Sequence, residues 1–161
     1  MQVILDLAAA SPRRDIDTGE VLVHEGAPTG TLFVLLDGVL RVEKSGNVIA
    51  WISEPGVCVG EIGLLLDVPA TADVVADRPS VVAVIDNAAD LLNARPDLSL
   101  ALARTLATRL QHMTTYLADL QDQYRDHEGG LGMVDTVLSS LLHRSGTRTE
   151  LASERDPNPE Y

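Results

Sequence analysis

The sequence has only one cysteine, Cys58, so no disulfide can form within the 161-residue chain. Small proteins of oxidising compartments commonly depend on disulfides. The opening stretch MQVILDLAAA also lacks the positive charge and the longer apolar core of a secretory signal. In addition, no uncharged apolar run approaches the roughly 18 residues that suggest a membrane span. These absences predict a cytoplasmic protein without a membrane segment.

Basic residues are scarce as well. The chain has 12 Lys and Arg against 24 Asp and Glu, which gives a formal net charge of -12. Such a charge repels the phosphates of nucleic acids, whereas a DNA-binding domain normally has a basic face. We therefore expect no DNA partner.

Residues that carry metal or catalytic chemistry are also few. A metal-binding barrel needs several His and acidic ligands that converge from neighbouring strands, and His24 is the only His in the β-rich half. Cys58 has no nearby basic residue to stabilise a thiolate, so we expect a small core residue. Trp51 is expected to pack in the barrel. The sequence predicts neither a metal site nor an enzyme.

The chain does contain a β-rich half. From Val21 to Ile85, runs of Val-, Ile- and Leu-rich residues alternate with turn sequences. Asp37-Gly38 is a strong hairpin signal because both residue types tolerate positive φ. Strands of this length close into a small barrel or sandwich. The predicted strands are 20–24, 31–36, 39–44, 47–53, 72–77 and 80–85.

A helical half follows. The apolar spacing becomes helical near 87–94 and again, beyond Pro96, over 97–127. In the longer helix the apolar residues follow a heptad spacing, which predicts a homodimer because a second helix would cover them. The alternative is that this stripe packs on its own barrel. The residues of this predicted dimer seam are Leu106, Leu110, Met113, Leu117, Leu120 and Tyr124.

The chain is thus predicted to have four parts. A barrel domain with short flanking helices spans 1–96, and the long helix spans 97–127. A short helix over 131–143 and a polar, mobile tail over 144–161 complete the chain.

Four stretches occur in an informative order: GEVLVHEG at 19–26, TLFVLLDGVLRVE at 31–43, EPGVCVGEIGLL at 54–65 and PATADVVA at 69–76. With the long helix, this order resembles the cyclic-nucleotide-binding domain of the catabolite activator and fumarate-nitrate regulator superfamily. The resemblance implies a mainly β fold with helices, in which a small antiparallel β-barrel of the jelly-roll (double-stranded β-helix) type precedes a long C-terminal dimerisation helix. It also implies a cyclic nucleotide, cAMP or cGMP, or a related small anion as ligand. Because the residues after the helix are too few for a winged helix-turn-helix, we expect the stand-alone form.

The predicted ligand site centres on the segment GEIGLLLDVPATA that begins at Gly60. Gly60 and Gly63 permit close backbone approach, and a turn that opens near Ile62 would direct N–H groups at an anion. The Glu61 carboxylate can accept a hydrogen bond from a sugar hydroxyl, and the resemblance implies the ribose 2′-hydroxyl. The alternative is a surface carboxylate that caps the turn.

The sequence departs from the superfamily pattern at Ala70. The pattern Pro-Arg-(Thr/Ser)-Ala would place a phosphate-clamping arginine there, whereas Thr71 either keeps the adjoining hydroxyl or simply starts a strand. On the long helix, the resemblance places the residues that face the base near Arg109, Met113 and Thr114. Arg109 is a candidate replacement cation, or else a solvated flank of the seam.

Two functions remain open at this stage. The first is a sensor or regulatory module with weak or altered nucleotide specificity, because a clamp of charge-assisted hydrogen bonds is missing. The second is a degenerate, ligand-independent dimeric module that binds another protein.

Overall fold

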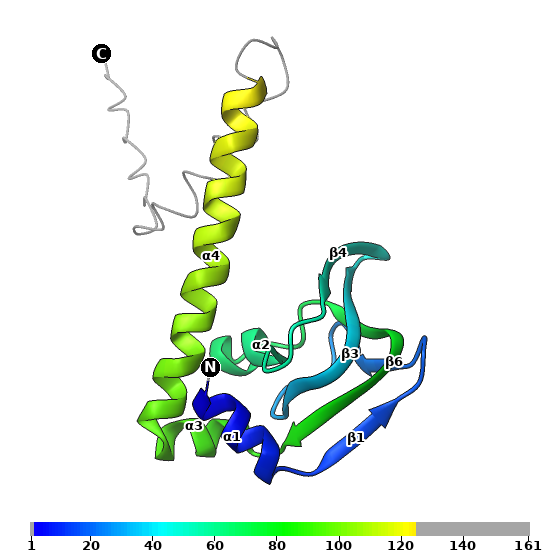
Figure 1. The fold of residues 1–161 in the computed structure, drawn as a ribbon, viewed down its shortest axis with the longest axis vertical. Coiled ribbons are helices and arrows are strands. Elements are labelled where there is room, and N and C mark those ends of the chain that lie inside the picture. The colour runs from blue at the N-terminus through cyan, green and yellow to red at the C-terminus, as the bar shows by residue number, and fades with distance from the viewer. Residues whose placement is uncertain (1, 125–161) are drawn as a thin grey trace, which may run out of the picture. The chain divides into compact units, whose positions relative to one another are not determined.

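The computed structural model describes residues 2–124 (Figure 1). The predicted helix over 131–143 and the predicted tail over 144–161 lie outside the described residues. The described elements, in chain order, are α1 (Gln2–Ala10), β1 (Arg13–Ile16), β2 (Val21–Val23), β3 (Leu32–Lys44), β4 (Asn47–Ile52), β5 (Cys58–Val59), α2 (Glu61–Leu66), β6 (Asp73–Ile85), α3 (Ala88–Ala94) and α4 (Pro96–Tyr124).

The sheet is antiparallel and has β6 and β3 at its centre. Its order is β1-β6-β3-β4, while β2 also pairs with β6 and β5 also pairs with β3. β3 and β6 run alongside each other as the two long strands (Figure 1). The predicted fold class is therefore confirmed: an antiparallel β domain with helices, followed by a long C-terminal helix.

The predicted hairpin at Asp37-Gly38 is wrong. β3 continues through both residues, and β6 continues through Pro79, so two pairs of predicted short strands are in fact two long strands. Their pairing shifts register near Gly38, which has a φ of 102°. Such shifts bend long strands without ending them, and this bend is the role of the glycine.

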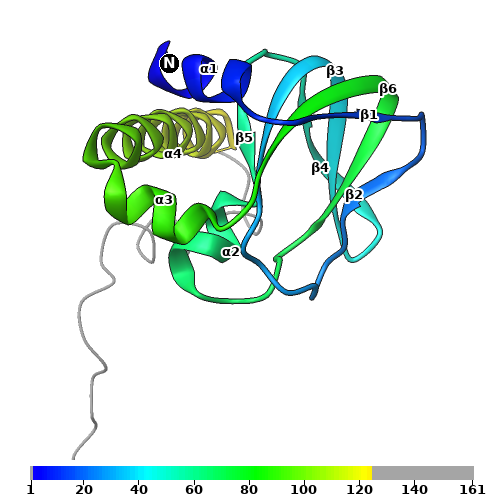
Figure 2. The ribbon, with the colours of Figure 1, turned by 90° about the horizontal axis from the view of Figure 1, so that it is seen from below.

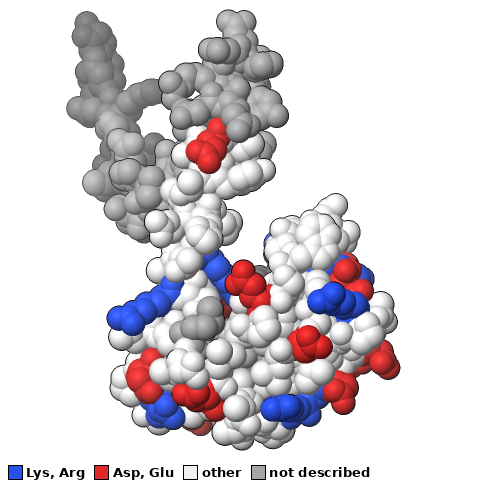
Figure 3. Space-filling model, viewed as in Figure 1, with Lys and Arg blue, Asp and Glu red and all other residues white. Residues whose placement is uncertain are grey.

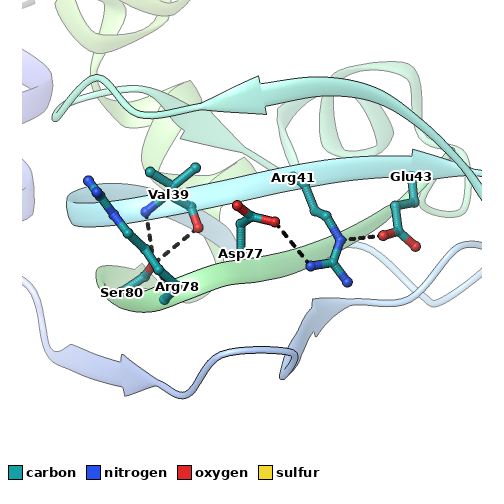
Figure 4. Close-up of polar contacts among 6 residues, drawn as sticks. All are labelled: Val39, Arg41, Glu43, Asp77, Arg78 and Ser80. Atoms are coloured by element: carbon teal, nitrogen blue, oxygen red, sulfur yellow. Dashed lines mark hydrogen bonds and ion pairs between the residues drawn. The ribbon is translucent and has the colours of Figure 1, made fainter.

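Gly38 also lies very close to Ser80 of β6. A Cβ at Gly38 would lie 2.2 Å from Ser80 Oγ and 2.5 Å from Ser80 Cα. The buried Ser80 hydroxyl accepts the Val39 N–H at 3.0 Å and donates to the Arg78 carbonyl at 2.8 Å (Figure 4). The two strands are thus held by close backbone contact at the bend.

The apolar side chains form two buried clusters. One lies between the sheet and the helices α1, α3 and the first turns of α4, and Figure 2 shows these helices together on one side of the sheet. It includes Ile4, Leu32, Leu98 and Leu102. The second cluster fills the interior of the curved sheet and includes Leu40. The sequence analysis predicted short flanking helices within 1–96 but gave no residue range for helix α1.

The long helix α4 crosses a boundary between two compact units. The first unit ends at Arg109 and the second begins at Leu110. The helix Pro96–Tyr124 covers the described part of the predicted helix 97–127, and residues 125–127 lie outside the described residues. No helix among the described residues is long and apolar enough to cross a membrane.

Trp51 differs from its prediction. Its side chain is 63% exposed on β4, a strand that pairs only with β3 and whose other residues are also largely exposed. The prediction of barrel packing is therefore wrong, because an edge strand that extends past the core does not bury either face.

Candidate functional site

A cavity opens in the first unit between β3, β4, β6, the start of α2 and α4. Its volume is about 120 Å³, which is below the roughly 300–1,000 Å³ of most small-molecule sites. Most of its wall is apolar. The apolar side chains that line it are Val23, Val42, Ile52, Val59, Ile62, Ala70, Ala72 and Val74.

The floor of the cavity is shaped by two glycines at the start of α2. Gly60 precedes the helix with a φ of 88°, and a Cβ there would lie 2.9 Å from the Thr31 carbonyl. A Cβ at Gly63 would lie 2.4 Å from the Thr29 methyl group. Both residues line the cavity, but the close approach that they permit is to the chain itself. Glycine at these positions lets α2 pack against the loop before β3.

Glu61 is the buried polar group of the cavity. Its side chain is only 4% exposed, and its Oε1 accepts a hydrogen bond from Arg109 Nη1 at 2.5 Å. The second terminal nitrogen of Arg109 donates to the carbonyl oxygen of Cys58 at 2.9 Å. An isolated buried carboxylate is costly, and Arg109 supplies the partner that Glu61 needs in the cavity wall. The structure thereby favours a cavity carboxylate over a surface cap.

Ala70 and Thr71 also line the cavity. The Ala70 side chain is buried and too short to reach a ligand with a polar atom, and Thr71 is exposed at the mouth. Near the mouth, Lys44 Nζ donates to the Thr71 carbonyl oxygen at 2.5 Å and lies 3.4 Å from Glu25 Oε1. Lys44 was not among the predicted site residues.

Cys58 is a core residue, as expected. Burial, followed by the charge of Glu61, raises the pKa of the Cys58 thiol to about 12. A thiol with so high a pKa is not a nucleophile near neutral pH. Among the described residues no group of three His, Cys, Asp or Glu could hold a metal ion.

The structure brings together most of the predicted ligand-site residues. The seven that line this one cavity are Gly60, Glu61, Ile62, Gly63, Ala70, Thr71 and Arg109. Thr114 belongs to the second unit, where its hydroxyl donates to the Leu110 carbonyl within its own helix.

The predicted dimer seam divides between the two units. Leu106 packs against the buried cluster of its own unit, which is the alternative that the heptad spacing left open. In the second unit, Leu110 and Met113 are 48% and 59% exposed. Leu117 and Leu120 are half-buried, and the side chain of Tyr124 lies outside those described.

The sequence analysis missed most of the apolar wall. Val42, Ile52 and Val74 project from three different strands, and only the strand register shows that they meet. Val42 pairs with both Ala50 and Val74. The strand register would therefore have placed Val42 beside Val74. Single-sequence patterns do not supply that register when strands are long and bulged.

Comparison with known proteins agrees with this geometry. The family described as cyclic nucleotide-binding domain matches residues 13–93, which is half of the chain. The chain therefore belongs to the cyclic nucleotide-binding domain family. The superfamily resemblance of the sequence is confirmed at this level.

Curated relatives and solved structures support the same conclusion. The chain is 35% identical over 103 residues to acetyltransferase Pat of Mycolicibacterium smegmatis, covering 62% of this chain and 31% of that protein. It is 27% identical to the N-terminal domain of a transcriptional regulator from Streptomyces coelicolor A3(2), with a TM-score of 0.51 over 68% of this chain and 82% of that one. A protein of a cyclic-GMP-dependent signalling pathway that regulates bacterial phytopathogenesis shares the fold, with 21% identity and a TM-score of 0.59 over 70% of this chain and 94% of that one. The chain spans less than a third of the length of the curated relatives that it matches.

Proposed function

We propose that the chain is a sensor or regulatory module whose cavity takes a nucleotide-type ligand and binds cAMP or cGMP only weakly. One observation carries the proposal: a buried carboxylate, Glu61, lines an apolar cavity in a member of the cyclic nucleotide-binding domain family. An ionised carboxylate only accepts hydrogen bonds. A ligand hydroxyl is its natural partner.

The weak binding of a cyclic nucleotide follows from the alanine at position 70 of the cavity lining. Ala70 offers no donor to a cyclic phosphate. A hydrogen bond to a charged group contributes on the order of 1.5 to 3 kcal/mol, and a bidentate arginine clamp contributes more. Loss of the clamp therefore lowers the affinity for a cyclic nucleotide by at least about tenfold.

The test is a gain of function measured by calorimetry. Ala70→Arg should strengthen binding of cAMP or cGMP by at least about tenfold, because it supplies a charge-assisted clamp. Glu61→Ala in the same background should remove the gain, since the hydroxyl acceptor is lost. Submicromolar binding by the unaltered protein, or no gain from Ala70→Arg, would refute the weak-clamp proposal.

The second candidate is a dimeric module that contacts another protein without a ligand. It is favoured by the exposure of Leu110 and Met113 on α4, since exposed apolar residues at heptad spacing are typical of a helix that pairs with a second copy. Sedimentation decides this point. The unaltered protein should be a dimer at tens of micromolar and Leu110→Glu a monomer, whereas a monomeric unaltered protein would exclude the homodimer.

The expected absence of DNA binding stays a prediction. On the face drawn in Figure 3, the described Lys and Arg side chains are scattered among acidic ones and form no continuous basic patch. Salt-dependent duplex binding needs several phosphate contacts on one face. Selection of a defined site from random duplex DNA by gel shift would overturn the prediction.

A further inference from the structure

We propose that the cavity prefers an uncharged ligand with an apolar body and hydroxyl donors, of which a nucleoside is the test case, over the corresponding cyclic nucleotide. The inference rests on the proposed function, because it concerns the same cavity. The inference adds that the preferred ligand is uncharged. This follows from how the charged side chains of the described residues are paired.

The lining of the cavity is electrically neutral. Arg109 is the one Lys or Arg among the described lining residues, and Glu61 is the one carboxylate. The two form an ion pair at 2.5 Å, and the same guanidinium also donates to the Cys58 carbonyl at 2.9 Å. The cation is therefore already engaged by two acceptors of the protein.

The mouth of the cavity offers no better cation. Lys44 donates to the Thr71 carbonyl and lies near Glu25. Asp73 follows the lining residue Ala72, and its Oδ1 accepts the Glu25 N–H at 2.7 Å. The carboxylates of Glu25 and Asp73 therefore lie near the single charge of Lys44, so the local charge disfavours an anion.

A cyclic phosphate would therefore enter as an unpaired negative charge. The wall that it would face includes buried Ala70 and Val74, which cannot replace its lost hydration. It could draw Arg109 away, but Glu61 would then be left as a buried carboxylate without its counter-ion. Either arrangement weakens the binding of the anion.

An uncharged ligand meets neither penalty. A sugar hydroxyl can donate to the carboxylate of Glu61 while Arg109 stays in place, because a carboxylate has acceptor positions for several donors. The apolar wall can cover a flat base. Adenosine and cAMP form a suitable pair of probes, since they share base and ribose, and the cyclic phosphate of cAMP replaces two hydroxyls of adenosine.

The experiment measures the affinity of the full chain for adenosine and cAMP, and for guanosine and cGMP, by calorimetry. We expect the preferred nucleoside to bind at least about tenfold more tightly than its cyclic nucleotide. Ala70→Arg should reverse this order, and the uncharged control Ala70→Gln should not. Glu61→Ala should weaken the binding of the nucleoside.

The outcomes separate this inference from the proposed function. If the unaltered protein binds the cyclic nucleotide weakly, but as tightly as the nucleoside or more tightly, the inference is overturned while the proposed function stands. If neither class binds to any variant, both are overturned. The comparison of ligands on the unaltered protein remains decisive even if Ala70→Arg fails to fold.

Discussion

Two arginines of the first unit bind carboxylates in opposite surroundings. Arg41 lies on the β3–β6 pair, where its guanidinium donates to Glu43 and, at 3.3 Å, to Asp77 (Figure 4). Arg109 donates to Glu61 in the cavity wall. The side chain of Asp77 is 43% exposed and that of Glu61 is 4% exposed. Glu43 is 22% exposed, so the two regions differ in how far water reaches the carboxylates and not in the exposure of the arginines, which is 27% for Arg41 and 35% for Arg109.

This difference indicates what holds each region together. If Arg41 is removed, water can solvate its partners, so the ion pairs there are peripheral to stability. The strands in that region are held by their backbone pairing and by the Ser80 hydroxyl, which lies against Gly38 at the bend. Water has much less access to Glu61, so there the ion pair is itself the structural contact. The three predictions that follow test this contrast in order of expected effect.

The largest effect is expected at the strand bend. Gly38→Ala should lower the free energy of unfolding by about 3 kcal/mol, because it adds a positive-φ penalty of about 1–2 kcal/mol to an overlap with Ser80. Denaturation followed by circular dichroism measures the change. Gly46→Ala is the matched control, since Gly46 has a φ of 79° but nothing within 4 Å of its added Cβ. Equal losses in the two variants would show that the contact with Ser80 contributes nothing.

The second effect is expected at the buried pair. Arg109→Met should lower the free energy of unfolding by about 2 kcal/mol, below the full cost of breaking a buried pair because Arg109 is 35% exposed. Arg104→Met is the control on the same helix, because Arg104 is exposed and takes part in no ion pair among the described residues. Arg and Met have similar helix propensities.

A double-mutant cycle sharpens this test. In a Glu61→Gln background, Arg109→Met should cost at least about 1 kcal/mol less, because a neutral amide does not need the counter-ion. Additive losses would mean that Arg109 acts through its contact with Cys58 or through packing instead.

The extent to which the sequence predicted the fold depends on the range of each signal. The antiparallel class and the long helix followed from local periodicity and from the ordered stretches. The false hairpin at Asp37-Gly38 arose because a dipeptide that favours a turn also suits a bulge in a long strand. Only the pairing of β3 with β6 distinguishes the two outcomes, and that pairing joins residues that lie far apart in the sequence.

The candidate site shows the same limit. Gly60, Glu61 and Ala70 were found together because they are close in sequence and match an ordered pattern. Arg109 was named only as a possible cation, and its pairing with Glu61 spans 48 positions. Spacing in a single sequence cannot indicate which carboxylate an arginine reaches across a folded domain.

The smallest loss of stability is expected for a substitution of Arg41. A small loss there, beside a larger one at Arg109, is what the comparison predicts. Arg41→Met removes both contacts, to Glu43 and to Asp77, yet the unfolding midpoint should stay within experimental error because both carboxylates remain partly accessible to water and salt, which screen ion pairs. The methionine keeps the apolar stem that covers the strand.

The pairs with Glu43 and Asp77 raise the pKa of Arg41, but a guanidinium is protonated at ordinary pH in any case, so the variant should also show no new dependence of stability on pH. Measurements at low and high salt complete the test. A loss as large as that of Arg109→Met, or one that appears only at low salt, would show that these ion pairs stabilise the strand pair and that the exposure of the carboxylates does not distinguish the two sites.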